Sequence, residues 1–209
     1  MFSALQDNLE GIDDFDSELA KEIIGNGKIC GRELMRFLKN RARFELRHDR
    51  PHFFLVTSDG RKPGEISEYV AEQGFHVGNF ADSMIHHSSF FTTSGNTYLI
   101  GIRFGDEFTE SERTNENIRK KAGYRGWLTP PAETGYLSRV KISDEILKKM
   151  GIGRLIMMHD PIPDSEEIPS LFALTSTGAG KWLGARCGRP GAGWKSTDGF
   201  GFLVPQVGL

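Results

Sequence analysis

The sequence predicts an α+β protein in which a mixed helical and strand region, residues 1–129, precedes an antiparallel β-meander in residues 130–209. Helical and strand patterns alternate in the first half, whereas four short apolar runs separated by Pro, Gly and Asp fill the last third. Gly accounts for 25 of the 209 residues, well above the usual share of about 7%, which indicates many turns. Pro130 and Pro131 mark the break, although the two regions are also compatible with packing as one domain.

The clearest helix is the amphipathic segment 31–46. Its apolar residues recur at spacings of three and four, at Leu34, Phe37, Leu38 and Ala42. Basic residues form a stripe along another face, at Arg32, Arg36, Lys39, Arg43 and Arg47. Because residues 1–22 are mostly acidic, we expect this stripe to be a solvated face, to pair with the acidic segment, or to bind a partner.

Local signals define the elements that follow this helix. A strand in residues 52–58 ends at the turn pair Asp59-Gly60. Pro63 suits the first turn of a helix that ends at Gly74, and a short helix is expected in residues 78–85. The nearly continuous apolar run 96–104 is typical of an interior strand.

Two further helices carry capping signals. Thr109 and Glu112 have capping-box spacing, which predicts a helix from Thr109 to Gly123. Ser143 begins a second helix, which ends at Gly151. The four strands expected after it are GRLIMMHDPIP, SLFALTS, KWLGARC and GFGFLVPQV, in residues 153–207.

Composition argues against several classes of protein. The formal net charge of -2 makes the whole chain a poor binder of polyanions. No apolar run approaches the roughly 20 residues of a membrane span, and the acidic start does not resemble a secretory signal. Cys30 and Cys187 are the two cysteines, which favours free thiols in a reducing, cytoplasmic compartment.

The glycine-rich stretch 175–202 twice resembles a phosphate-binding loop. Such a loop needs a first Gly, then Gly-Lys followed by a hydroxyl residue. Around Gly180-Lys181, Thr175 replaces the first Gly and Trp182 replaces the hydroxyl residue, and Trp194 interrupts the second occurrence. The pattern therefore favours hairpin turns between short strands, with Trp182 and Trp194 as packing partners or as an exposed contact surface.

Cys30 is the candidate nucleophile of an enzyme. It precedes the basic helix and lies near Lys28 and Arg32, and both the helix dipole and the cations favour a thiolate. A cysteine hydrolase or deamidase would also need a base, and the candidates are His76, His86 and His87, with Asp82 or Asn96 to orient it. Ordinary apolar packing of the cysteine is the competing interpretation.

Metal and nucleic-acid sites are weaker hypotheses. His159 and Asp160, with the acids at 164, 166 and 167, match no metal-binding spacing, so we interpret them as a solvated loop and expect no metal or cofactor. Residues 65–85 have the layout of a helix-turn-helix, but the second helix offers no Lys or Arg.

The function that best fits these observations is binding of another macromolecule, most simply a protein, as a regulatory, adaptor or assembly component. Its positive support is the uneven charge and the aromatic residues in turn-rich strands, namely Trp182, Trp194 and Phe200. The alternatives are a hydrolase that uses Cys30 and a helix-turn-helix nucleic-acid-binding protein. No membrane partner is expected.

Overall fold

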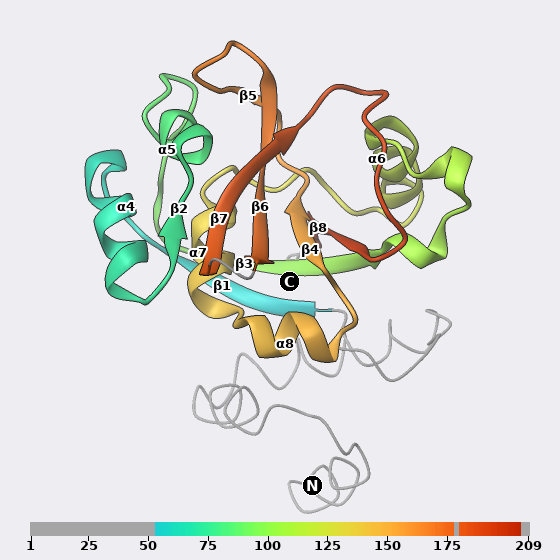
Figure 1. Cartoon of the computed structure of the whole chain (residues 1–209), viewed down its shortest axis with the longest axis horizontal. Helices are drawn as coiled ribbons and strands as arrows, with labels where there is room; N and C mark the ends of the chain where they lie inside the picture. The colour runs from blue at the N-terminus through green and yellow to red at the C-terminus, as the bar shows by residue number, and fades with distance from the viewer. Residues whose placement is uncertain (1–52, 178–179, 206–209) are drawn as a thin grey trace, which may run out of the picture. The chain divides into compact units, whose positions relative to one another are not determined.

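The structure is a computed structural model that describes residues 53–177 and 180–205 (Figure 1). All of these residues belong to one compact unit, Arg50–Leu209. The expected basic helix in 31–46, with Arg32, Arg36, Lys39, Arg43 and Arg47, lies outside the described residues, as does Cys30. Among the described residues, no helix has the length and apolar character needed to cross a membrane.

A curled mixed sheet of eight strands forms the centre of this unit, as Figure 1 shows. The strands along the sheet, in spatial order, are β1 (Phe53–Asp59), β3 (Ser94–Phe104), β8 (Asp198–Leu203), β4 (Arg154–Met157), β6 (Pro169–Thr177), β7 (Gly180–Cys187) and β2 (His76–Val77). The short strand β5 (Ile162–Pro163) pairs with β6. Strands from both sides of Pro130 therefore share one sheet.

The prediction of an α+β fold is confirmed, but the prediction of a simple C-terminal antiparallel meander is wrong. Strands β6 and β7 form an antiparallel hairpin, whereas β8 pairs in parallel with β4 and antiparallel with β3. The physical reason is burial: nearly every residue of β8 is buried, so this strand needs a neighbour on each side. The chain after β7 therefore crosses the sheet, and β8 lies between β3 and β4 instead of next to β7.

Both faces of the sheet are covered, and strand alternation divides the apolar residues between them. On β4, Leu155 joins one core cluster and Ile156 joins the other. The first cluster contains buried residues of α4 (Pro63–Glu72), α5 (Asn79–Ile85), α7 (Thr134–Lys141) and α8 (Asp144–Lys149). The second contains those of α6 (Asn115–Gly123) and its flanking loops. We call the α6 side the second face of the sheet.

Several predicted element ends are confirmed. Helix α4 begins at Pro63, and Gly74 has the positive φ of 82° that suits the residue after a helix. Ser143 caps α8 by accepting a hydrogen bond from the Ile146 N–H at 3.3 Å, and Gly151 has a φ of 69°.

Two helical predictions need correction. Thr109 and Glu112 have the expected capping-box bond, but they cap the 3-10 turn η2 (Glu110–Glu112), and α6 begins only after its own cap at Thr114. Helix α7 was missed, because the two prolines before it indicated a break. It lies close to β6, since a Cβ on Gly135 would come within 2.7 Å of the Phe172 side chain.

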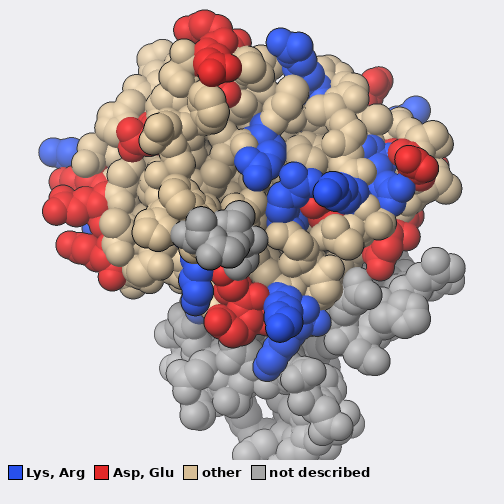
Figure 2. Space-filling view, in the orientation of Figure 1, with Lys and Arg blue, Asp and Glu red and all other residues tan. Residues whose placement is uncertain are grey.

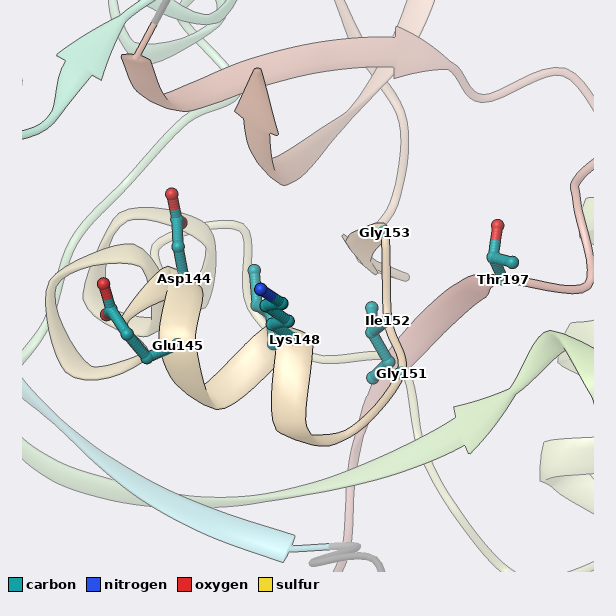
Figure 3. A pocket seen from close by; sticks show the side chains of 8 residues that line it. Asp144, Glu145, Lys148, Gly151, Ile152, Gly153 and Thr197 are labelled. Carbon is teal, nitrogen blue, oxygen red and sulfur yellow. The ribbon is translucent and has the colours of Figure 1, made fainter. Parts of the chain in front are cut away.

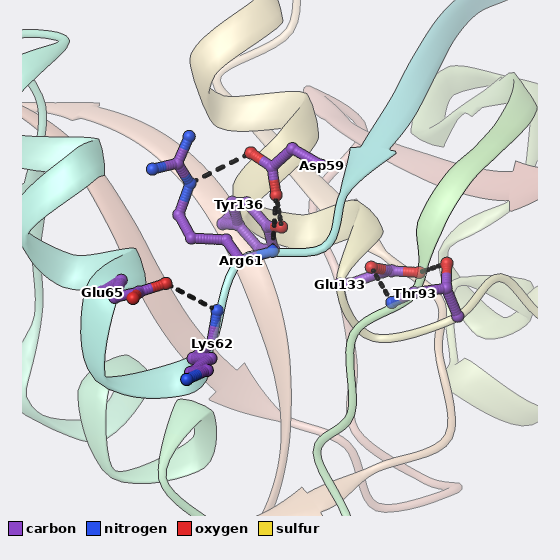
Figure 4. A network of polar contacts seen from close by, with 7 residues as sticks. All are labelled: Asp59, Arg61, Lys62, Glu65, Thr93, Glu133 and Tyr136. Carbon is purple, nitrogen blue, oxygen red and sulfur yellow. Dashed lines mark hydrogen bonds and ion pairs between the residues drawn. The ribbon is translucent and has the colours of Figure 1, made fainter.

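A polar network fixes α7 to the β1–β3 hairpin (Figure 4). Glu133, which is fully buried, accepts hydrogen bonds from the Thr93 N–H at 3.0 Å and from the Thr93 and Tyr98 hydroxyls at 2.8 Å. Asp59 accepts from the Tyr136 hydroxyl at 2.8 Å. Burial alone would raise the pKa of Asp59, but the hydrogen bonds from Tyr136 and Arg61 outweigh it and lower that pKa.

Candidate binding surface

A row of four residues crosses the second face of the sheet. Trp182 on β7 is the direct cross-strand partner of Thr175 on β6, and Thr175 is the partner of Arg154 on β4. Arg154 is in turn paired with Asp198 on β8. Because cross-strand partners point to the same face, these four side chains are neighbours although they come from four strands.

Arg154 and Asp198 form a two-pronged ion pair within this row. Arg154 Nε lies 2.8 Å from Asp198 Oδ1, and Nη2 lies 2.6 Å from Oδ2. The Lys195 N–H also donates to Oδ2, at 2.9 Å. Asp198 is almost completely buried, whereas Arg154 is half-buried and its guanidinium lies 5.9 Å from the centre of the Trp194 ring. The carboxylate thus fixes an arginine that still reaches the surface.

Arg186 is the second cation of this surface. It lies on the same face of β7 as Trp182, because the two residues are four positions apart along a strand. Burial first, and then the charge of Arg154, lower the pKa of Arg186, while Asp198 acts in the opposite direction. Asp198 forms its ion pair with Arg154, so the charge of Arg186 is left over and the two guanidinium groups leave a net positive charge. Figure 2 shows Lys and Arg side chains gathered in the middle of the visible face.

An apolar hollow adjoins these cations, and we call it the β7 cleft. Its volume is about 300 Å³, and it lies between the first turn of α5 and β7. Its lining residues are Gly78, Asn79, Phe80, Ala81, Thr175, Trp182, Gly184, Ala185 and Arg186. Phe80 is 43% exposed, and the Trp182 ring packs against the His76 ring with a centroid distance of 4.7 Å. The cleft therefore combines aromatic walls with a cationic end.

The two tryptophans predicted as binding residues have different surroundings. Trp182 lines the β7 cleft. Trp194 donates its indole N–H to Asn115 Oδ1 at 2.9 Å and meets Phe200 edge to face, at 5.9 Å between ring centres. Its polar group is thus satisfied internally, so Trp194 supports Arg154 and the second core cluster more than it faces a ligand.

A larger hollow, of about 630 Å³, lies between α8 and Thr197 (Figure 3). Asp144, Glu145 and Lys148 project from α8 at its rim. Asp144 lies 2.9 Å from Arg139, and Glu145 lies 3.6 Å from Lys181. Its acids are therefore already paired with cations, and none of the residues that line it is aromatic. This hollow suits a partner less well than the β7 cleft does.

The histidines predicted as catalytic bases lie in two places. His76 is exposed on β2 beside Trp182, so it belongs to the binding surface. His86 Nδ1 lies 2.9 Å from the Asp82 carbonyl oxygen and 3.7 Å from its carboxylate, so the structure brings this pair together. His87 Nδ1 is 2.7 Å from the Ser89 hydroxyl. The hydrolase hypothesis stays a prediction, because the nucleophile Cys30 lies outside the described residues.

The remaining candidate groups are used within the fold. Asn96 donates its backbone N–H to Ser58 Oγ at 2.9 Å, and its amide nitrogen is 3.5 Å from the Tyr98 hydroxyl. His159 is fully buried, with Nδ1 2.7 Å from the Asp160 carbonyl oxygen and Nε2 accepting from the Phe172 N–H at 2.9 Å. In the described part of the chain, no group of three or more His, Cys, Asp or Glu could hold a metal ion.

The two helices of the expected helix-turn-helix are present as α4 and α5. The segment between them contains β2, which pairs in parallel with β7. Helix α5 buries Ala81, Met84 and Ile85 in the first core cluster and exposes Phe80 at the β7 cleft. The exposed start of α5 therefore faces the same surface as Trp182.

Sequence reasoning missed Arg154, Arg186, Asp198 and Phe80. A signal for Arg186 was present, because a period of two in the strand KWLGARC places Trp182, Gly184 and Arg186 on one face. Arg154 and Asp198 had no such signal, since their contact depends on a parallel pairing of β4 and β8. Comparisons of the chain with protein-family models, curated proteins and solved structures found no match.

Proposed function

We propose that the protein binds a partner protein through the surface formed by the β7 cleft and Arg154, as a regulatory, adaptor or assembly component. The observation that carries this proposal is the convergence of Trp182, Arg186 and Arg154 on one face of the sheet, next to an exposed Phe80. Tryptophan and arginine are the residues most enriched at the energetic centres of protein interfaces. A pocket that buries one aromatic or aliphatic anchor would form such a centre.

The lining of the β7 cleft favours binding over catalysis. Its polar side chains are those of Asn79, Thr175, Arg186 and the Trp182 indole. None of the residues that line it is an Asp, Glu or Cys, and the nearby His76 packs its ring against Trp182. General acid–base or nucleophilic catalysis would need such a group within hydrogen-bond reach of the substrate.

Affinity capture with matched variants tests the proposed function. The full chain is immobilised, incubated with nuclease-treated extract and compared with Trp182→Ala, Arg186→Glu and Phe91→Ala. Phe91 is an aromatic residue that is 63% exposed and does not line the β7 cleft, so it is the matched control. We expect wild type and Phe91→Ala to retain the same proteins, and the two cleft variants to retain at least tenfold less.

Two results would contradict the proposal. Retention by Trp182→Ala and Arg186→Glu at the wild-type level would show that the cleft is not the contact surface. Capture from untreated extract that is lost after nuclease treatment would favour a nucleic-acid-binding function. Thermal unfolding of each variant shows whether loss of binding reflects loss of folding. The Trp182 and Arg186 side chains are both only half-buried, so we expect both variants to fold.

A further inference from the structure

We propose that the partner presents an extended acidic peptide, which adds as a strand to the free edge of β7 in the β7 cleft. This inference rests on the proposed function and names the chemistry of its partner. Three features at one place are its basis. The neighbouring strand β2 is short, backbone groups of Ala185 face outward, and the cation Arg186 has no carboxylate of its own among the described residues.

The edge of β7 is only partly covered. Strand β2 has two residues, and it pairs with Trp182 and Leu183 alone. Strand β7 continues to Cys187, so Ala185–Cys187 has no strand partner on that side within the described residues, whereas Gly78 lies beside Gly184. The chain after β2 leaves the sheet at Gly78, whose N–H donates to the Leu183 carbonyl at 2.9 Å, and enters α5.

The backbone of Ala185 points toward this edge. Its cross-strand partner on β6 is Phe172, and the Phe172 N–H donates to His159 Nε2 at 2.9 Å on the side away from β7. The two residues therefore form a non-hydrogen-bonded pair, in which both N–H and C=O of Ala185 are directed away from β6. The Ala185 carbonyl accepts from Arg186 Nη1 at 2.6 Å, and Ala185 lines the β7 cleft.

Side-chain positions along β7 define the sequence that would fit. Trp182, Gly184 and Arg186 alternate on the second face of the sheet. Gly78 lies beside Gly184, so an added strand leaves the edge at this point, and its apolar residue enters the cleft beside Trp182 and Phe80. The peptide residue opposite Arg186 lies two positions along the peptide from this apolar residue. A carboxylate at that position would pair with the Arg186 guanidinium. The expected pattern is an apolar residue and an acid separated by one residue.

The same observations favour a peptide over a single-stranded nucleic acid. Arg154 is already held by Asp198, so Arg186 is the main cation at the cleft. A polynucleotide gains affinity from several phosphate contacts along its backbone, whereas one guanidinium suffices for one carboxylate. A peptide strand can also accept a hydrogen bond from the outward-facing Ala185 N–H.

Selection from a displayed library of random octapeptides tests the proposal. The full chain is the target, and Arg186→Glu is used for counter-selection. We expect enriched peptides to contain Asp or Glu two positions from a large apolar residue, and to bind Arg186→Glu at least tenfold more weakly than wild type. Replacing that acid with Lys should restore binding to Arg186→Glu. Selection without enrichment, or equal binding to both proteins, would overturn the proposal.

Backbone methylation of the best peptide tests strand addition itself. N-methyl groups at alternate amides should reduce affinity at least tenfold for one set of positions and little for the other, because only one edge of the peptide faces β7. If no methylation has an effect, strand addition is wrong, while capture that depends on Trp182 would leave the proposed function intact. Displacement of the peptide by oligo-dT with a steep salt dependence would assign the surface to nucleic acid and refute the proposal.

Discussion

Arg154 and Asp198 face each other across the parallel strands β4 and β8 and are joined by two hydrogen bonds, of 2.8 and 2.6 Å. The pair connects the chain after Trp194 to the centre of the sheet, since the Lys195 N–H donates to the same carboxylate. It also sets the position of one of the two guanidinium groups of the proposed binding surface. Stability and binding should therefore depend on the same contact.

A double-mutant cycle on this pair should show strong coupling. Arg154→Met leaves the buried Asp198 carboxylate with the Lys195 N–H but no cation, so we expect it to lower the free energy of unfolding by roughly 2 kcal/mol. Adding Asp198→Asn removes the unpaired charge. We expect the double variant to be at least about 1 kcal/mol more stable than the sum of the single effects, as measured by urea unfolding. Additive effects would show that the pair contributes nothing.

His159 should make stability depend on pH. Burial first, and then the charge of Arg119, lower its pKa to about 4, although the Asp160 carbonyl raises it. In the unfolded chain the pKa is about 6.5, so below that pH the unfolded state binds the proton and the folded state does not. Stability should therefore fall as pH decreases from 6.5 toward 4, by about 2 kcal/mol between pH 7 and pH 5 from this group alone.

Urea unfolding at several pH values isolates this contribution. His159→Gln retains a carbonyl that can accept from the Phe172 N–H, and its stability should lose the part of the pH dependence that His159 supplies. If wild type and His159→Gln have parallel profiles between pH 5 and pH 7, His159 does not titrate as the structure requires.

His159 also illustrates how far the sequence alone could lead. Local signals placed β1, β3, α4 and α8, because turn pairs, caps and apolar periods depend only on neighbours in the chain. The sequence suggested a solvated loop at His159, yet the side chain is buried because β6 supplies Phe172 as a hydrogen-bond partner. Such a contact is set by strand pairing, and pairing is not a local property.

The candidate site was predictable to a similar extent. Trp182 followed from its residue type and its turn-rich setting, and the structure places it in the β7 cleft. The Arg154–Asp198 pair depends on β8 lying between β3 and β4, which a meander would not produce. Phe80 is exposed because its neighbours Ala81 and Met84 face the core, and only the docking of α5 decides which side is outside.

Glu133 should be important for stability through its acceptor role. Glu133→Ala would leave the Thr93 N–H and the Thr93 and Tyr98 hydroxyls without their buried acceptor, so we expect a loss of about 2–4 kcal/mol in the free energy of unfolding. Glu133→Gln keeps one acceptor oxygen and should be intermediate. Glu68→Ala, at an exposed position of α4, should change stability by less than about 0.5 kcal/mol. Equal unfolding midpoints for Glu133→Ala and Glu68→Ala would refute this role.

Gly105 links the fold to the binding surface through close backbone contacts. It lies at the start of η1 (Gly105–Glu107), and a Cβ there would collide with the carbonyl oxygen of Lys195 and come within 2.9 Å of those of Ser196 and Asp198. These backbone atoms cannot rotate away, so Gly105→Ala must displace residues 195–198. Because Asp198 holds Arg154, the displacement should disturb the cationic part of the surface.

We therefore expect Gly105→Ala to lower the free energy of unfolding by about 1–3 kcal/mol and also to weaken partner capture, under conditions in which the variant is still folded. Gly123→Ala is the matched control, because a Cβ on this glycine of α6 meets nothing within 4 Å. It should be neutral or slightly stabilising, since alanine favours a helix. If Gly105→Ala lost stability but captured partners as wild type does, the position of Arg154 would not matter for binding, and the contact would be confined to the β7 cleft.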